Sequence, residues 1–262
     1  MTPAHQILVG DCIEQMRGLA DQSVDMILTD LPYGTTQCRW DSVIPFEPMW
    51  EQYLRVAKPS AAIVLMSAQP FTALLVASNL PLFRYEWIWE KGNATGFLNA
   101  KKQPLRAHEN AVVFYREQPV FNPQMTHGHQ RRTSRRHSVN SECYGKALEL
   151  VEYDSTSRYP RDVQFFSSDK QLGNYHPTQK PVALMRYLVE TYTHPGQVVL
   201  DSCAGSGTTA VACVESHRSS ISIEMDPEYT PVIASRIDLA LTAMAAKSSQ
   251  LDIFNDTKEP AA

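Results

Sequence analysis

The sequence predicts an α/β protein in which a mostly parallel, seven-stranded sheet is flanked by helices. Seven short apolar runs end in polar residues or glycine, as strands buried on both faces do. Segments with helical spacing separate several of these runs, and such alternation of strand and helix favours a doubly wound sheet. The chain of 262 residues is long enough for one large domain that carries an insertion.

The expected elements follow one another along the chain. The strands are residues 6–11, 24–30, 61–67, 85–91, 110–117, 197–202 and 220–226. The helices are residues 12–20, 46–58, 70–79, 181–193 and 208–217. In the fourth strand Tyr85, Trp87 and Trp89 alternate, and we interpret this as packing against a helix rather than as a platform for stacked bases.

Polar and basic residues without clear periodicity interrupt this alternation between positions 118 and 160. We expect an insertion there that is mobile when nothing is bound to it. The expected parts are the first half of the main domain (1–117), the insertion (118–165), the second half (166–246) and a C-terminal tail (247–262).

Charge is distributed unevenly along the chain. The net charge is −4, yet residues 84–146 carry eleven Lys and Arg against five Glu, which gives that segment +6 and the remainder −10. Such asymmetry is typical of a protein that offers one basic face to phosphates.

Membrane and secreted proteins are disfavoured. No apolar run reaches the roughly 18 residues that span a bilayer, and the N-terminal residues do not resemble a secretory signal. Five cysteines without paired spacing indicate free thiols, so we expect a cytoplasmic, nucleoid-associated protein. His127, His129 and Cys143 lack a fourth ligand at suitable spacing, and we expect no metal site.

A glycine-rich turn joins an expected strand to a helix at residues 198–210, VVLDSCAGSGTTA. Gly205, Gly207 and Ala210 fit a nucleotide-binding turn, in which the backbone approaches the ligand closely and a helix N-terminus offers free N–H groups. Glu224, at the end of the next strand, is placed to accept hydrogen bonds from a ribose.

Two kinds of protein carry such a turn: a dinucleotide-binding dehydrogenase and a protein that binds S-adenosylmethionine. A dehydrogenase would build most of its sheet after the turn, but only 38 residues follow Glu224. The remaining strands must therefore come from the N-terminal half, and this permuted order disfavours the dehydrogenase.

The residues Asp30, Leu31, Pro32 and Tyr33 follow the second expected strand, at the sheet edge where ligands bind. The Asp30 carboxylate and the Leu31 carbonyl are two acceptors that can each take an N–H of an exocyclic amine and aim its lone pair at a methyl donor. Pro32 restricts Leu31 to an extended conformation. Tyr33 offers a ring on which an extruded base can stack.

Three motifs together resemble the amino-methyltransferases that modify DNA, in the permuted order of the β class. They are DLPY at 30–33, NYHPTQKPVAL at 174–184 and VLDSCAGSGTT at 199–209. The resemblance covers roughly residues 5–240. It implies a Rossmann-like sheet, S-adenosylmethionine as the methyl donor, and the exocyclic amine of adenine or cytosine in double-stranded DNA as the acceptor.

The resemblance also implies roles for particular residues. Asp11 and Cys12 would lie near the adenine of the cofactor, and His176, Thr178 and Lys180 near its methionine end or the rim of the active site. Residues 118–160 would recognise the target sequence. The full expected cofactor site is Asp11, Cys12, His176, Thr178, Lys180, Asp201, Cys203, Gly205, Gly207, Thr208 and Glu224.

One residue departs from the family pattern, which usually has proline where this chain has Leu31. The carbonyl is retained, so we expect activity with a less rigid loop. The initial Asp30 favours adenine, with the amine of cytosine as the alternative. A ring-carbon cytosine methyltransferase is disfavoured because the chain has no Pro-Cys dipeptide. A catalytically silent DNA-binding homologue and methylation of RNA or of a protein glutamine are further alternatives.

Basic residues outside these motifs are candidates for DNA contact. Lys101, Lys102 and Arg106 lie between two expected strands, and we expect them to contact phosphates. Four arginines of the insertion would divide between phosphate contacts and base reading: Arg131, Arg132, Arg135 and Arg136.

The expected tail contains Gln250-Leu-Asp-Ile-Phe254, which resembles the short peptide with which bacterial replication proteins dock on the sliding clamp. An extended apolar and aromatic peptide suits a groove on a partner, although these side chains would also suit packing on the domain. Both a monomer and a homodimer remain open.

Overall fold

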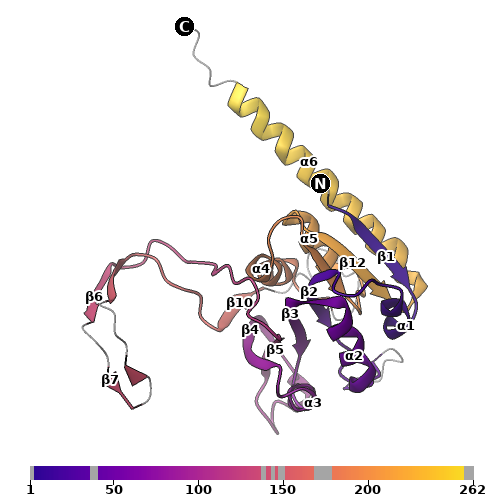
Figure 1. Ribbon diagram of the computed structural model, residues 1–262, viewed down its shortest axis with the longest axis horizontal. Helices are drawn as coiled ribbons and strands as arrows, with labels where there is room; N and C mark the ends of the chain where they lie inside the picture. The colour runs from indigo at the N-terminus through magenta and orange to yellow at the C-terminus, as the bar shows by residue number, and fades with distance from the viewer. Residues whose placement is uncertain are drawn as a thin grey trace. The chain divides into compact units, whose positions relative to one another are not determined.

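The computed structural model describes residues 3–35, 41–136, 140–142, 145–146, 151–167 and 179–256 (Figure 1). The chain divides into two compact units. Unit 1 consists of residues 1–122 and 162–262, and unit 2 of Pro123–Arg161. Within the described ranges, no helix has the length and apolar character needed to cross a membrane.

An eight-stranded sheet forms the centre of unit 1. Its strands are β1 (His5–Val9), β2 (Val24–Asp30), β3 (Ala57–Ser67), β4 (Phe83–Thr95), β5 (Arg106–Phe114), β10 (Val163–Phe166), β11 (Val198–Asp201) and β12 (Ser219–Glu224). Their order across the sheet is β1-β12-β11-β2-β3-β5-β4-β10. Only β5 runs antiparallel to its neighbours β3 and β4, so the sheet is mostly parallel, as predicted.

All seven expected strands are present, but the number seven is wrong because β10 adds an eighth. This strand lies in VQFF, a run of only four residues at the end of the expected insertion, and it pairs in parallel with β4 from Val163↔Ile88 to Phe166↔Lys91. Alternate residues of β10 are exposed, as in an edge strand. So short a run carries too little hydrophobic signal to be recognised from sequence.

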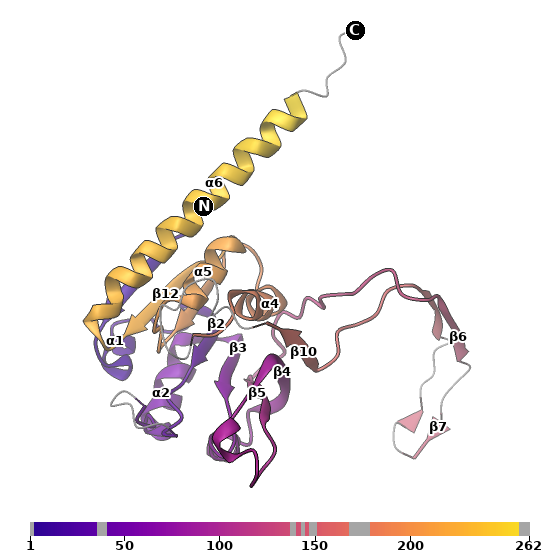
Figure 2. The same cartoon turned by 180° about the vertical axis from the view of Figure 1, so that it is seen from behind.

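Helices cover both faces of the sheet (Figures 1 and 2). α1 (Cys12–Arg17), α2 (Phe46–Val56) and α3 (Phe71–Ser78) pack on one face, and α4 (Val182–Tyr192) and α5 (Thr208–Glu215) on the other. Side chains of β2 alternate between the two cores: Ile27 contributes to the first, and Met26 and Leu28 to the second. The alternation explains why these strands read as continuous apolar runs.

The alternating aromatics of β4 pack against α4. Trp87 and Trp89 are buried in the same core cluster as Leu188, and the Trp87 indole donates a hydrogen bond of 2.7 Å to the hydroxyl of Tyr192. Tyr85 is partly buried against that cluster. This confirms the prediction that the pattern reflects packing.

α6 (Thr230–Asp256) was not predicted. The expected tail, residues 247–262, begins inside this helix. Ile233 and Ile237 pack on Ala210 and Val214 of α5, which fixes the N-terminal half of α6 to unit 1. The sequence around 239–247 is rich in Ala and Leu, strong helix formers that carry the helix onward. Gln250 to Phe254 are therefore helical rather than extended.

Unit 2 contains an antiparallel pair, β6 (Arg132–Arg136) with β9 (Val151–Ser155), and a short pair, β7 (Asn140–Ser141) with β8 (Gly145–Lys146). A bridge between Thr126 and Arg158 continues the first pair. β6 reads RTSRR and buries none of its described side chains, so the period-two apolar pattern on which strand prediction depends is missing.

Candidate active site

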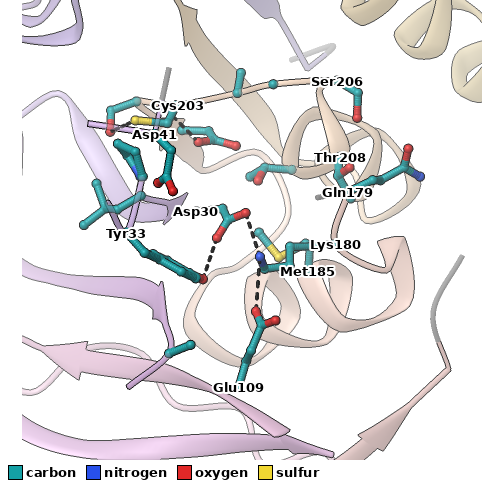
Figure 3. A pocket seen from close by; sticks show the side chains of 18 of the residues that line it. Asp30, Tyr33, Asp41, Glu109, Gln179, Lys180, Met185, Cys203, Ser206 and Thr208 are labelled. Carbon is teal, nitrogen blue, oxygen red and sulfur yellow. Dashed lines mark hydrogen bonds and ion pairs between the residues drawn. The ribbon is translucent and has the colours of Figure 1, made fainter. Parts of the chain in front are cut away.

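A cavity of about 600 Å³ lies at the carboxyl ends of the central parallel strands in unit 1 (Figure 3). Four segments that follow β1, β2, β11 and β12 contribute to its wall: Gly10–Cys12, Asp30–Tyr33, Ser202–Ser206 and Met225–Asp226. Residues of β4 and β5 complete it. Its volume is in the range of sites that enclose a small-molecule ligand.

Asp30 ends β2 and turns its carboxylate into this cavity. One carboxylate oxygen, Oδ1, accepts a hydrogen bond of 2.8 Å from the Tyr33 hydroxyl. The other, Oδ2, lies 2.7 Å from the ammonium nitrogen of Lys180, which immediately precedes the proline that opens α4. Figure 3 shows both contacts. They hold the carboxylate in one orientation from two sides.

The ion pair continues away from Asp30 as a chain of alternating charges. The ammonium of Lys180 lies 3.2 Å from the carboxylate of Glu109 in β5, and that carboxylate lies 2.5 Å from the ammonium of Lys91 in β4. The Lys180 side chain is only 8% exposed, and that of Asp30 24%. Buried charges are tolerated when each one is paired, and this arrangement pairs all four.

Burial and pairing act in opposite directions on these groups. Burial raises the pKa of Asp30, and the nearby Lys180 cation only partly opposes it. Burial by itself would lower the pKa of Lys180, but the two carboxylates outweigh it and raise the pKa. Burial would likewise raise the pKa of Glu109, but the two lysines lower it. Lys180 and Glu109 are therefore charged at neutral pH.

A buried carboxylate holds the two residues that directly follow Tyr33. Asp41 accepts hydrogen bonds from the backbone N–H groups of Gly34 and Thr35, at 2.8 and 2.9 Å. Gly34 has φ of +66°, and a Cβ there would lie 2.8 Å from Val43, so only glycine fits. The Leu31 side chain is buried in the core. These contacts hold residues 31–35, where the chain has Leu31 in place of the proline usual in the family.

The Tyr33 ring stacks on Phe71, with ring centroids 5.3 Å apart and an angle of 24° between the planes. The ammonium of Lys180 lies 5.4 Å from the centroid of the same ring. Burial raises the pKa of Tyr33 well above its usual value, so the hydroxyl stays protonated and donates to Asp30.

The glycine turn begins at Asp201, the last residue of β11. Its carboxylate accepts a 2.6 Å hydrogen bond from the Thr29 hydroxyl and one of 3.2 Å from the Cys203 N–H, and burial raises its pKa to about 6. Glu224 accepts from the N–H groups of Gly205 and Asp226, at 2.6 and 2.9 Å. The end of β12 is thereby joined to the turn.

α6 supports the same turn from behind. Gly207 has φ of +79°, and a Cβ there would lie 2.8 Å from Ile233, so the turn and the helix are in close contact. The buried guanidinium of Arg236 donates to the carbonyl and the hydroxyl oxygen of Ser206, at 2.7 and 2.9 Å.

The end of β1 meets the turn from a third side. Asp11 accepts hydrogen bonds from the N–H groups of Ile13 and Glu14 and so caps α1. The neighbouring Cys12 thiol and burial raise the pKa of Cys203.

Comparison with known proteins identifies the family. A family model described as DNA methylase, of the N6/N4 type, matches residues 24–235, which is more than three quarters of the chain. The chain belongs to the N6/N4 DNA methylase family. It is 26% identical over 268 residues to the DNA adenine methyltransferase YhdJ of Escherichia coli (strain K12), a match that covers 90% of this chain and 84% of that protein.

Two solved structures resemble the methylase in fold. The crystal structure of the M1.HpyAVI-SAM complex has a TM-score of 0.61 at 23% identity and covers 88% of this chain and 98% of that one. The PvuII DNA methyltransferase, cytosine-N4-specific, has a TM-score of 0.63 at 17% identity, covering 90% and 88%. The predicted Rossmann-like methyltransferase fold is confirmed.

Most site residues predicted from the sequence come together around the cavity of the methylase. Its lining includes Asp11, Cys12, Asp30, Leu31, Pro32, Tyr33, Arg106, Lys180, Asp201, Cys203, Gly205, Thr208 and Glu224. Gly207 belongs to the glycine turn but not to the lining, and it faces Ile233 of α6. Lys180 contacts Asp30 within this lining. His176 and Thr178 lie outside the described residues.

The other predicted residues lie apart from this cavity lining. Lys101 and Lys102 are exposed in the loop between β4 and β5. Arg131 of unit 2 forms an ion pair with Asp154, in which its Nε lies 2.7 Å from the carboxylate. Arg132 and Arg135 are exposed on β6, and the side chain of Arg136 lies outside the described ones.

The histidines of unit 2 make polar contacts. His127 lies within 2.8 Å of the Ser157 hydroxyl and His129 within 2.7 Å of the Thr126 hydroxyl. Cys143, the other candidate ligand, lies outside the described residues.

Four functional candidates were missed by sequence reasoning: Asp41, Lys91, Glu109 and Arg236. Glu109 carried a weak signal, since only Asn110 separates this acid from the run of buried apolar residues that ends β5. Arg236 is buried in a helix that was not predicted, and its partner Ser206 lies thirty residues away.

Proposed function

We propose that this DNA methylase transfers a methyl group from S-adenosylmethionine to the N6 amine of adenine in duplex DNA, directly and in line. The observation that carries the proposal is the Asp30 carboxylate, oriented by Tyr33 and Lys180 at a cavity that the glycine turn also lines. An acceptor group and a nucleotide-binding turn in one cavity suit a reaction between a nucleotide-like donor and an amine.

The residues of the cavity fit S-adenosylmethionine, which would supply the methyl group. Gly207 permits a tight turn, and a residue with a Cβ could not take its place because the Cβ would clash with Ile233. Glu224 uses its two oxygens for backbone N–H groups, yet a carboxylate has further lone pairs with which to accept from a ribose. Asp11 and Cys12 would lie near the adenine end, as the family resemblance implies.

Asp30 and Leu31 act on the amine to be methylated. Each oxygen of Asp30 has one protein partner and retains a lone pair for an amine N–H. The Leu31 carbonyl, held by Pro32 and by the buried Leu31 side chain, takes the second N–H. These two hydrogen bonds orient the lone pair of the amine toward the methyl group. The Asp30 carboxylate stabilises the positive charge that develops on the amine nitrogen during the transfer.

Tyr33 gives the extruded base an aromatic neighbour. Phe71 supports its ring and Asp30 fixes its hydroxyl, so the ring is positioned before any base arrives. A base taken out of the duplex is recognised in such a pocket by stacking and by hydrogen bonds to its edge.

Adenine is preferred because the motif begins with Asp30, and because the E. coli relative described above is an adenine methyltransferase. Methylation of the cytosine N4 amine is the second candidate, because the cytosine-N4-specific PvuII enzyme has a similar fold. Retention of Asp30, Pro32 and Tyr33 disfavours a catalytically silent homologue.

Unit 2 is proposed to recognise the target sequence, with Arg132 and Arg135 toward the DNA. Lys101, Lys102 and Arg106 are proposed to contact phosphates beside the cavity. Docking on the sliding clamp through Gln250 to Phe254 stays a prediction, and an extended docking peptide would require the end of α6 to unwind.

The test uses purified protein, labelled S-adenosylmethionine and mixed-sequence duplex DNA, followed by digestion to nucleosides and mass spectrometry. We expect N6-methyladenine, and we expect Asp30→Ala to abolish it, because one acceptor of the amine is lost. Asp238→Ala, an exposed position on α6, is the control and should keep full activity. N4-methylcytosine would establish the second candidate. No label on DNA would contradict the proposal.

A further inference from the structure

The loop between β4 and β5 exposes two large apolar side chains side by side. Phe97 is 81% exposed and Leu98 99%, and no other large apolar residue in the described part of the chain is as exposed. Both lie in η1 (Phe97–Asn99), a single turn of 3-10 helix at the tip of the β4–β5 hairpin. Exposed apolar residues that are grouped at a projecting tip mark a site of interaction.

The tip is ordered by its own backbone. Gly96 has φ of +94°, and its carbonyl accepts a hydrogen bond of 2.9 Å from the N–H of Asn99. Ala100 N–H donates to the Phe97 carbonyl at 3.0 Å and Lys102 N–H to the Asn99 carbonyl at 2.8 Å. The two apolar side chains are therefore presented by a preformed turn, which lowers the entropy lost when they meet a partner.

The stems of the hairpin are walls of the candidate active site. Every second residue at the end of β4 lines the cavity: Trp89, Lys91, Asn93 and Thr95. Arg106, His108 and Glu109 of β5 line it as well. Figure 2 shows β4 and β5 lying side by side. The tip with Phe97 and Leu98 therefore lies only two residues beyond Thr95, the last residue of β4 in the cavity lining.

The charge of the tip fits DNA. Between Gly96 and Arg106 the sequence holds Lys101, Lys102 and Arg106 and no acidic residue. The tip therefore presents apolar side chains beside basic ones. A DNA duplex can contact both kinds, because its stacked bases are apolar and its phosphates are negatively charged.

We propose that Phe97 and Leu98 enter the base stack at the position vacated by the target base, while Lys101 and Lys102 contact the flanking phosphates. The inference rests on the proposed function and assigns to the same site the part that opens the duplex. Extrusion of a base leaves a gap between its stacked neighbours, and apolar side chains that fill the gap recover part of the lost stacking. Phe97 supplies the flat surface and Leu98 the bulk.

The experiment compares Phe97→Ala/Leu98→Ala with the unmodified protein and with Leu239→Ala, which removes an exposed leucine from α6. Mixed-sequence duplexes first identify the methylated site. That site is then placed in two short duplexes, one with the target base paired and one with it opposite an abasic position. Affinity for S-adenosylmethionine and the melting temperature of each variant establish that it is folded.

We expect the double variant to lose about tenfold or more in kcat/KM on the paired duplex, the range of a lost base-stacking contact. On the duplex with the abasic position the loss should largely disappear, because no pairing opposes extrusion. Lys101→Ala/Lys102→Ala should instead raise the KM for both duplexes and make this KM less dependent on salt concentration. Leu239→Ala should match the unmodified protein on both.

Three results would overturn the inference. Equal kcat/KM for the double variant and the unmodified protein would show that the tip does not act on the duplex. An equal loss on both duplexes would assign it a general structural role. Unchanged kinetics together with a lower sedimentation coefficient, measured by analytical ultracentrifugation of the same variants, would assign it to contact between two copies. If the unmodified protein methylates no DNA, the proposed function fails as well, and this outcome is distinct from the first three.

Discussion

Asp30 is connected to two charged residues that lie far from it in the sequence. Lys180 contacts it directly, and Glu109 contacts Lys180, so the carboxylate lies at the end of a buried ion chain. Lys180 lowers the pKa of Asp30, whereas the charge of Glu109 raises it. The protonation of the proposed catalytic carboxylate therefore depends on both neighbours, in opposite directions.

This opposition predicts the pH dependence of two variants. Asp30 must be ionised to accept the amine N–H, so activity falls as pH drops through its raised pKa. Lys180→Met removes the cation, raises the pKa of Asp30 further and should shift the acidic limb of the kcat profile to higher pH. Glu109→Gln removes a negative neighbour and should shift it to lower pH.

The measurement is kcat from about pH 5 to about pH 9 at saturating DNA and S-adenosylmethionine. Asp238→Ala is the control and should leave the profile in place. If both variants lose activity by the same factor at every pH, the two residues only support the structure, and the electrostatic interpretation is wrong.

At the scale of elements, α6 holds the glycine turn in shape. Ile233 fills the space that the absent Cβ of Gly207 leaves open, and Arg236 donates to two oxygens of Ser206. A turn that must approach a ligand with its backbone cannot fill its own interior, so a neighbouring helix supports it.

We predict that Arg236→Met weakens binding of S-adenosylmethionine more than it weakens the fold. Methionine retains the apolar stem but cannot donate, and the loss of charged hydrogen bonds should cost about 1.5–3 kcal/mol of unfolding free energy. Calorimetric titration with the cofactor and urea unfolding would measure both effects.

Arg17→Met is the matched control, because Arg17 is exposed on α1 and pairs only with Glu14 among the contacts described. It should leave both quantities within about 0.5 kcal/mol of the unmodified protein. Unchanged cofactor affinity in Arg236→Met would contradict the prediction that α6 supports cofactor binding through Arg236.

At the scale of the whole molecule, the chain divides into two compact units. Every residue that lines the cavity belongs to unit 1, whereas the arginine-rich strand β6 belongs to unit 2. The proposed division assigns the reaction to unit 1 and selection of the DNA sequence to unit 2.

The division predicts that Arg132→Ala/Arg135→Ala weakens DNA binding and leaves cofactor binding unchanged. If each arginine meets one phosphate, the slope of log affinity against log salt concentration should fall by about two. Arg17→Ala/Arg186→Ala removes the same charge from unit 1 and should change the slope little. Equal slopes in both double variants would contradict a specific role for β6.

Much of the fold and the site could be predicted from the sequence, because the signals are local in the chain. The apolar runs predicted seven strands, and Gly205, Gly207 and the DLPY residues each marked a turn at the end of one of them. Turn chemistry and apolar periodicity act over a few residues, so they can be read without knowing the neighbours.

Only the tertiary structure decided which distant residues meet. Lys180 contacts Asp30 across 150 positions, and the contact exists because α4 packs beside β2 once the strands are ordered. β10 and α6 were missed for the same reason: a four-residue edge strand and a helix of low amphipathicity are specified by their partners. By itself, the sequence determined the turns and the acceptor groups. The order of the sheet determined the pairing of charges, because such contacts depend on distances in space rather than along the chain.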